Sequence, residues 1–286
     1  MGKRKVLVLG GTNYFGKILV SKLIESGELV TLATRGLSKD SFGDSVSRIV
    51  LDRNDLKDEL KDLEFDLVYD QICFTPEAAT ALLEVIKAPR IIFTSSQSVY
   101  APGNNLKEEQ LEYPSTDDPR LSNSTGLDYG TCKLLAEVAY LKSDKCKISS
   151  VRLPIVIDPA DQTGRFQFHL DRIINKRPLF FPNIEASLSM VTAEHAAEGL
   201  YKLGKISHSG PINVATGEIK LKSFLELVVS IKDGEFIPAS EEGEEQNSPY
   251  GIPSDWWMNL DNCKRLNLLE EVSLTSILKR MINSYE

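Results

Sequence analysis

The first hundred residues alternate between short apolar runs and stretches in which apolar residues recur at helical spacing. Continuously apolar strands separated by helices require crossover connections, which build a parallel sheet covered on both faces. Right-handed crossovers then give a doubly wound α/β structure. The expected strands are VLVLG (6–10), LVTLATR (29–35), RIVLD (48–52), FDLVYD (65–70) and RIIFTSS (90–96), and the expected helices cover 15–27 and 75–86.

The pattern lapses over residues 101–128, which are rich in Pro, Asn, Ser and acidic residues. A loop of this length inside a compact domain is usually functional or mobile. Regular spacing then predicts a helix over 129–142 and a strand over 148–157. Beyond Pro159, helical stretches alternate with short segments that contain proline, which predicts a smaller, mixed region packed on the carboxyl ends of the strands. The helices expected there cover 166–175, 194–203, 221–231 and 273–283.

Composition narrows the function classes. The 286 residues are 42% hydrophobic and 26% charged, as in ordinary globular proteins, and no apolar run approaches the ~20 residues of a membrane-spanning helix. The apolar stretch near the start is too short for a signal peptide, so a cytoplasmic protein is expected. The net charge of −8 makes nucleic-acid binding over most of the surface unlikely, although a local basic patch is left open.

Cysteine and histidine spacing argues against metal chemistry. The four cysteines have no short paired spacing, and the three histidines are dispersed along the chain. We therefore expect neither a metal site nor a disulfide framework.

A strand, a glycine turn and a helix follow one another directly in VLVLGGTNYFGKILVSKLI. Gly10 would let the chain turn tightly off the strand, and Gly16 would let the helix pack closely against the sheet. The first turn of the helix would then present backbone N–H groups to a phosphate. Asn13 stands where this pattern most often has glycine, and asparagine tolerates a left-handed conformation better than most residues. The alternative is a glycine turn that binds nothing.

The end of the second strand usually discriminates between dinucleotides. An acidic residue there would bond the ribose 2′-hydroxyl of NAD, but this chain has Thr34 and Arg35. A hydroxyl beside a guanidinium suits a 2′-phosphate, so NADP is somewhat favoured over NAD. The alternative is that Arg35 is a solvated loop residue. Asp52, at the end of the third strand, is placed to contact the adenine of the dinucleotide.

A serine, a tyrosine and a lysine offer a recognisable chemistry. Tyr129 and Lys133 are four residues apart on one helical face, and Ser96 ends the fifth strand at the sheet edge where such folds bind ligands. A neighbouring lysine charge and an oxidised nicotinamide would both lower the pKa of the phenol. Ser96 would hold the substrate oxygen, and Tyr129 would exchange its proton while hydride moves to or from the nicotinamide.

These motifs resemble the short-chain dehydrogenase/reductase superfamily, in particular its extended branch of NAD-dependent epimerases and dehydratases. The resemblance covers most of the chain. It rests on five segments: GGTNYFG, TSSQSVY (94–100), YGTCK, RLPIVIDP (152–159) and GPINVATGE (210–218). It implies a Rossmann domain over 1–157, completed by about 187–206, and a smaller substrate-binding region over 158–186 and 207–286. Lys133 would also bond the nicotinamide ribose. The expected dinucleotide contacts are Gly10, Thr12, Asn13, Tyr14, Phe15, Gly16, Thr34, Arg35, Asp52, Arg53, Phe74 and Lys133.

The resemblance has departures. SLSMVTAEH (187–195) lacks the arginine that epimerases of the family usually carry near the sugar nucleotide, and the chain is short for a nucleotide-sugar epimerase. GGTNYFG also resembles an atypical branch related to chloroplast RNA-binding proteins, whose members often lack the tyrosine that this chain retains. The leading hypothesis is an NAD(P)-dependent epimerase or dehydratase acting on a sugar or nucleotide sugar. The alternatives are an NADPH-dependent carbonyl reductase and a non-enzymatic dinucleotide-sensing or RNA-binding protein.

The resemblance also implies a homodimer built from two helices of each subunit, over about 76–87 and from Tyr129 onward. Along the second of these helices the apolar residues exceed what one covered face needs, which is consistent with such an interface. They are Leu134, Leu135, Val138 and Leu141.

Overall fold

The larger sheet is parallel, as the alternating pattern predicts, and it contains seven strands. The computed structural model describes residues 2–56, 58–159, 161 and 163–285. Chain order reverses at the centre of this sheet, between β1 and β4, and this switch point is where doubly wound folds bind ligands. In spatial order the strands are β11 (Gly210–Asn213), β7 (Lys147–Leu153), β5 (Arg90–Ser96), β4 (Leu67–Asp70), β1 (Lys5–Leu9), β2 (Leu29–Thr34) and β3 (Ser47–Val50).

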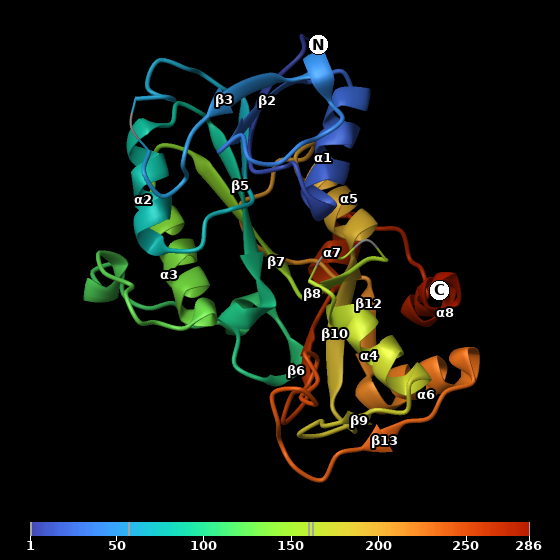
Figure 1. Cartoon of the computed structure of the whole chain (residues 1–286). Helices are drawn as coiled ribbons and strands as arrows, with labels where there is room; N and C mark the ends of the chain where they lie inside the picture. Colours follow the sequence, from blue (N-terminus) through green and yellow to red (C-terminus); the bar gives the residue numbers. More distant parts are fainter. Residues whose placement is uncertain (1, 57, 160, 162, 286) are drawn as a thin grey trace.

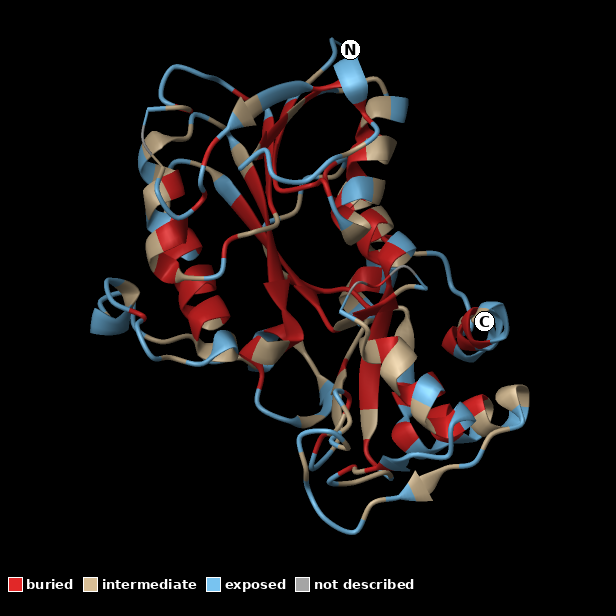
Figure 2. Cartoon of the chain, in the orientation of Figure 1, coloured by how far each residue is buried: buried red, intermediate tan, exposed pale blue. Residues whose placement is uncertain are grey.

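Helices cover both faces of this sheet (Figure 1). The first strand shows why the apolar runs are continuous: Val6 and Val8 pack into the core on one face, and Leu7 and Leu9 pack into the core on the other. Figure 2 shows the buried strands between helices whose inner sides are also buried. One face is covered by α1 (Tyr14–Glu25) and α5 (Ala193–Leu203), the other by α2 (Pro76–Val85) and α3 (Tyr129–Leu141).

A second, mixed sheet lies beyond the carboxyl ends of the larger one (Figure 1). It contains β12 (Gly217–Lys220), β10 (Ser187–Thr192), β14 (Trp256–Met258), β6 (Gly103–Leu106) and β8 (Ile155–Ile157), with only β10 and β12 paired antiparallel. The remaining elements of this part are α4 (Arg165–Ile174), β9 (Pro178–Leu179), α6 (Leu221–Lys232), β13 (Ile237–Pro238) and α8 (Leu274–Ser284), whereas α7 (Asp261–Arg265) packs against β11 in the core of the larger sheet.

Three features of this part differ from the prediction. The single strand expected over 148–157 is interrupted at Pro154, which has no N–H for a ladder, so β7 stays in the larger sheet and β8 joins the second. The 101–128 loop contributes β6 to the second sheet. β11 comes from 207–286, the stretch expected to serve the smaller region, yet it pairs with β7. The division of the chain into domains stays a proposal.

Helix α3 is buried on most of its surface. Leu135 and Val138 are 0% and 1% exposed within the single chain, so the argument that they exceed one covered face is wrong. Leu141 is 41% exposed and Leu134 is half-buried. The homodimer therefore stays a prediction that rests on resemblance alone. None of the described helices combines the length and the apolar character that crossing a membrane requires.

Candidate active site

The glycine turn lies between β1 and α1, at the carboxyl edge of the larger sheet. Gly10 and Gly11 have φ angles of +95° and +88°, which residues with a Cβ rarely adopt. A Cβ on Gly16 would lie 3.0 Å from the backbone Cα of Gly11 and would overlap Oε1 of Gln71, so glycine there lets α1 start close to the turn and to the end of β4. The prediction did not include Gly11, where a Cβ would lie 2.9 Å from side-chain carbons of Val8 and Val20. The doubled glycine was its signal.

Asn13 corrects one detail of the prediction. It has φ −130° and ψ 155°, which is extended backbone, so a tolerance for left-handed conformation is not what allows it in the turn. Beside the two glycines, the residue of the turn with positive φ is Tyr14, at +53°. The Asn13 side chain caps no N–H of α1, and its Nδ2 instead donates to Oγ of Ser38 at 3.3 Å. A helix start without a side-chain cap fits an anion-binding turn.

The other residues of the turn lie toward the second sheet. Thr12 is buried, and the phenol of Tyr14 donates to the carbonyl of Val156 in β8 at 2.8 Å. Phe15 lies on the wall of the cavity described below. The hydroxyl of Tyr14 thus links the glycine turn to β8 of the second sheet.

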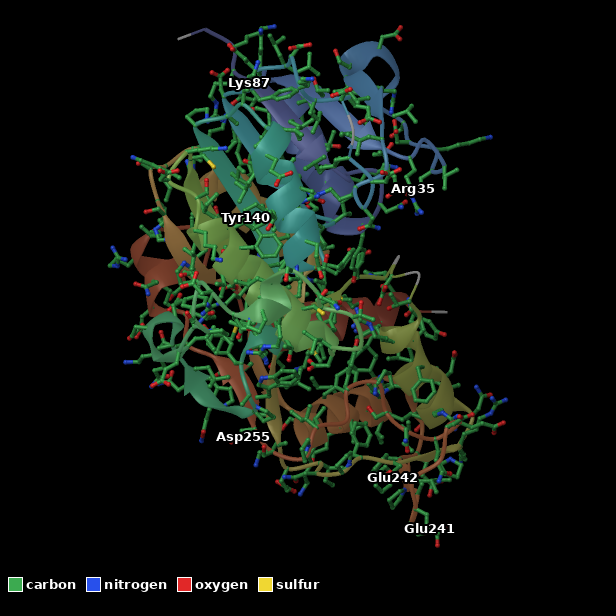
Figure 3. The ribbon with its side chains drawn as sticks, turned by 90° about the vertical axis from the view of Figure 1, so that its left-hand side faces the viewer. Arg35, Lys87, Tyr140, Glu241, Glu242 and Asp255 are labelled. Carbon is green, nitrogen blue, oxygen red and sulfur yellow. The ribbon has the colours of Figure 1, made fainter. Side chains whose placement is uncertain are left out.

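The ends of β2 and β3 carry the residues expected to choose the dinucleotide. Thr34 accepts a hydrogen bond from the backbone N–H of Gly36 at 3.2 Å, and Arg35 is exposed (Figure 3). Asp52 is exposed just beyond β3. These three side chains can be reached by a ligand without rearrangement of the core.

Arg53 lies in the core instead. It is only 3% exposed, and its guanidinium bonds Oδ2 of Asp70 at 2.5 Å and the carbonyl of Ala78 at 2.6 Å. The phenol of Tyr140 in α3 donates to the same Asp70 oxygen at 2.5 Å. Arg53 therefore links the chain after β3 to β4 and α2. Because Asp70 lies 17 residues further on, the sequence alone gave no signal of this pairing.

The structure brings Ser96, Tyr129 and Lys133 to one cavity. Ser96 ends β5 and begins the 3-10 turn η2 (Gln97–Val99), and its Oγ accepts the backbone N–H of Ser98 at 3.1 Å. Tyr129 opens α3, and its ring centroid is 6.3 Å from that of Phe74, another residue of the cavity.

Gly130 allows this approach and was not predicted. A Cβ on Gly130 would overlap the carbonyl oxygen of Ser98, so only glycine lets the first turn of α3 lie against η2. The signal was a glycine inside an otherwise helical pattern, immediately after Tyr129.

Lys133 has a buried ammonium group, and two of its three N–H donors make hydrogen bonds within the protein. Its Nζ is bonded to the carbonyls of Cys73 and Thr94, both at 2.7 Å, and lies 4.6 Å from the ring centroid of Phe93 and 5.1 Å from that of Phe74. Burial lowers the pKa of Lys133 to about 8. An ammonium has three N–H donors, so one is left for a ligand or for the phenol above it.

Without a bound dinucleotide, the pKa of Tyr129 is shifted in the direction opposite to the expected one. Partial burial raises its pKa above the ordinary value, while the Ser96 hydroxyl and the charge of Arg165 act in the opposite direction. The ammonium of Lys133 is 6.0 Å from the ring centroid and does not offset the burial. The expected lowering of the Tyr129 pKa by lysine is therefore not found, and it would have to come from an oxidised nicotinamide.

The cavity has a volume of about 480 Å³ and takes its walls from both sheets. Phe15, Ser96 and Lys133 belong to the larger part of the fold, and Ser189 in β10 faces them from the second sheet. Buried polar atoms without a partner call for an explanation such as a ligand or ordered water. Among the described residues, five on this wall each have one such occluded side-chain atom: Gln71, Thr94, Gln97, Tyr250 and Trp256.

The parallel sheet, the glycine turn ahead of α1 and the residues gathered at its carboxyl edge define the class of an α/β protein with a dinucleotide-binding fold. The model of the NAD dependent epimerase/dehydratase family matches residues 6–177. This is more than half of the chain, and the protein belongs to that family of enzymes. The predicted family and fold class are thereby confirmed.

Solved structures of epimerases share this fold. The UDP-glucuronic acid 4-epimerase of Bacillus cereus, in complex with NAD, is 17% identical with a TM-score of 0.73, covering 98% of this chain and 96% of that one. The UDP-glucose 4-epimerase of Thermotoga maritima, with UDP-glucose, is 17% identical with a TM-score of 0.70, covering 97% of each chain. At this identity the likeness concerns the fold alone.

A relative of another kind comes from a plant. The chloroplast stem-loop binding protein of 41 kDa b of Arabidopsis thaliana is 29% identical over 208 residues, which are 66% of this chain and 52% of that protein. The chain therefore spans about half the length of the curated relative it matches.

Proposed function

We propose that the protein is an NAD(P)-dependent enzyme of epimerase or dehydratase type that acts on a sugar or nucleotide sugar through Ser96, Tyr129 and Lys133. The observation that carries the proposal is the presence of these three side chains on one cavity at the carboxyl edge of the parallel sheet. The family and the glycine turn support a dinucleotide beside them.

The geometry supports a division of roles. The Ser96 oxygen already accepts the N–H of Ser98, so its own hydrogen can be donated to the Tyr129 phenol in the free protein and to the oxygen of the reacting substrate carbon when substrate is bound. Tyr129 would take the proton from that oxygen, or return it, at the mouth of the cavity. The remaining N–H of Lys133 would be donated to a ribose hydroxyl, and the positive charge of the ammonium would stabilise the phenolate. When bound, the nicotinamide supplies the hydride chemistry at the carbon that carries this oxygen.

Arg165 supports a substrate with phosphate. It opens α4 and lies on the cavity wall, and its positive charge acts on the phenols of Tyr129 and Tyr250. A guanidinium matches the geometry of phosphate oxygens. It could serve as the arginine that residues 187–195 do not supply, and this favours a nucleotide sugar over a free sugar.

The nearest alternative, a carbonyl reductase, would use the same three residues. An epimerase regenerates its dinucleotide in every cycle and can retain it, whereas a reductase must release it. We expect the purified protein to carry dinucleotide in near-stoichiometric amount, measured by absorbance and by chromatography after denaturation. Protein that is free of dinucleotide and oxidises NADPH with simple carbonyl compounds would favour the reductase.

The dinucleotide preference should follow the end of β2. We expect NADP to bind at least as well as NAD, and Arg35→Ala to weaken NADP about tenfold or more, since a hydrogen bond to a charged group contributes ~1.5–3 kcal/mol. NAD affinity should stay close to the parent value. Calorimetric titration checks both, with exposed Lys39→Ala on the same loop as the control for general charge. Equal losses for both dinucleotides, or a clear NAD preference in the parent, would show that this interpretation of Arg35 is wrong.

RNA binding is a second candidate, favoured by the identity to the stem-loop binding protein. Lys3, Lys5, Lys87 and Lys145 share a surface hollow at the amino edge of the larger sheet with two acidic residues, Glu64 and Asp66 (Lys87 is labelled in Figure 3). The net charge of the whole chain is −8. We expect stem-loop RNA to bind weakly at low salt, to dissociate at physiological salt, and to bind less to Lys87→Glu. Fluorescence anisotropy measures this. Salt-resistant, sequence-specific binding would instead establish the RNA candidate.

A further inference from the structure

A buried carboxylate continues the catalytic face of α3. Tyr129, Lys133 and Glu137 follow one another at four-residue steps, and Glu137 is fully buried. Its Oε1 accepts the hydroxyl of Ser95 at 2.5 Å. Since Ser95 immediately precedes Ser96, this bond joins the helix that carries the phenol to the end of the strand that carries the serine.

Arg152 of β7 completes the pair. Its guanidinium, also fully buried, bonds both oxygens of Glu137, at 3.0 Å through Nε and at 2.7 Å through Nη2. Planar, two-pronged contacts of this kind fix orientation as well as charge. A single carboxylate thus links three elements: α3, β5 and β7.

The long polar loop at 101–128 adds the last donor. The Tyr113 phenol donates to Oε2 of Glu137 at 2.6 Å and accepts from Nη2 of Arg152 at 2.7 Å. Each oxygen of Glu137 then has two donors. A buried ion pair depends on such complete hydrogen bonding, because any unmet group in the interior is costly.

We propose that Tyr113, Glu137 and Arg152 are positioning residues that set the placement of Ser96 relative to Tyr129, which gives the 101–128 loop its function. None of the three lies among the residues of the cavity wall. They act through Ser95 on one side and through α3 on the other. The inference rests on the proposed function for its catalytic consequence and on the bonds above for its structural one.

Tyr113→Phe is the sharpest test, because it removes one oxygen and keeps the ring. The chain offers a matched control in Tyr140→Phe. Tyr140, in the last turn of α3 (Figure 3), also donates to the carboxylate of a buried arginine–carboxylate pair, Asp70 with Arg53, but this pair joins β4 to the chain after β3 and not to the Ser95–Ser96 end of β5. Both variants should lose similar amounts of thermal stability, so stability alone cannot explain a difference between them.

Kinetics with UDP-glucose give the first readout. We expect Tyr113→Phe to lower kcat about tenfold, since small displacements of reacting groups are costly, with dinucleotide affinity unchanged. Tyr140→Phe should keep kcat close to that of the parent. Equal kcat values for Tyr113→Phe and the parent would overturn the proposal, as would equal losses in both variants.

A second readout needs no substrate. The Ser96 hydroxyl lowers the pKa of Tyr129, so a displaced Ser96 should let that phenol titrate at higher pH. Carbon-13 labelling of the tyrosine Cζ atoms follows the titration by NMR, with Tyr129→Phe to assign the signal and Ser96→Ala to give the largest shift. Tyr113→Phe should shift Tyr129 upward and Tyr140→Phe should not. An upward shift in a protein that turns over no sugar supports the positioning network while the proposed function fails. An unshifted Tyr129 contradicts the network.

Discussion

Replacing Tyr129 with phenylalanine should lower turnover by about 10²–10⁴, the usual contribution of a positioned proton-transfer group. Only a hydroxyl is lost, and the ring keeps its place beside Phe74, so the fold and most dinucleotide affinity should remain. Steady-state kinetics and dinucleotide titration, measured separately, check the two halves of this expectation.

Two further variants serve as a comparison and a control for Tyr129→Phe. Ser96→Ala should lose less turnover than Tyr129→Phe, because polarisation of the substrate is lost while the proton carrier remains. Tyr201→Phe, in α5 and outside the cavity, is the control for the loss of a phenol and should keep full activity. Full activity of Tyr129→Phe on a true substrate would show that Tyr129 serves only in the packing of α3 and has no catalytic role.

Lys133→Met should damage two properties together. Methionine has a similar length and suits the apolar surroundings, but it removes the ammonium to which the proposed mechanism assigns both the phenolate and the ribose. We expect turnover to fall at least as far as in Tyr129→Phe, and dinucleotide affinity to fall about tenfold or more. Lys142→Met, at the exposed end of α3, is the control for loss of a positive charge. A variant that loses turnover but binds dinucleotide normally would show that the ammonium does not reach the ribose.

The pH dependence of dinucleotide affinity, compared between the parent and Lys133→Met, tests the role of the ammonium in a second way. Burial lowers the pKa of Lys133 to about 8, so its charge is present below that pH and is lost as the pH rises through it. Dinucleotide affinity of the parent should therefore decline above about pH 8, whereas Lys133→Met should show no such decline. The same decline in the variant would assign the ionisation to another group.

Most of the fold could be predicted because strands buried on both faces have continuous apolar sequences, as Val6 to Leu9 illustrate. Pairing between distant segments could not be predicted. Pro154 is a local signal that the apolar run is interrupted, but nothing local indicates that the part after it joins the second sheet. Nor does the sequence indicate that Gly103–Leu106 from a polar loop pairs with Trp256–Met258. Such pairings depend on tertiary neighbours, which periodicity does not report.

The site shows the same division. The order of glycine turn, strand-end serine, tyrosine and lysine along the chain was enough to predict that Ser96, Tyr129 and Lys133 share a cavity. The burial of Arg53 against Asp70 and the network around Glu137 were not predicted, because each depends on partners in other elements. Gly11 and Gly130 had local signals, a doubled glycine and a glycine within a helix.

The most direct test of the account is reduction of dinucleotide bound to the protein. NAD-loaded parent and Tyr129→Phe are mixed with UDP-glucose or UDP-glucuronic acid, and the near-ultraviolet absorbance of reduced nicotinamide is followed in a single turnover. The account predicts reduction in the parent with at least one of these sugars, and reduction slower by about 10²–10⁴ in the variant at equal dinucleotide content. Reduction at the same rate in both proteins, or a parent that binds dinucleotide without any reduction by either sugar, would contradict it.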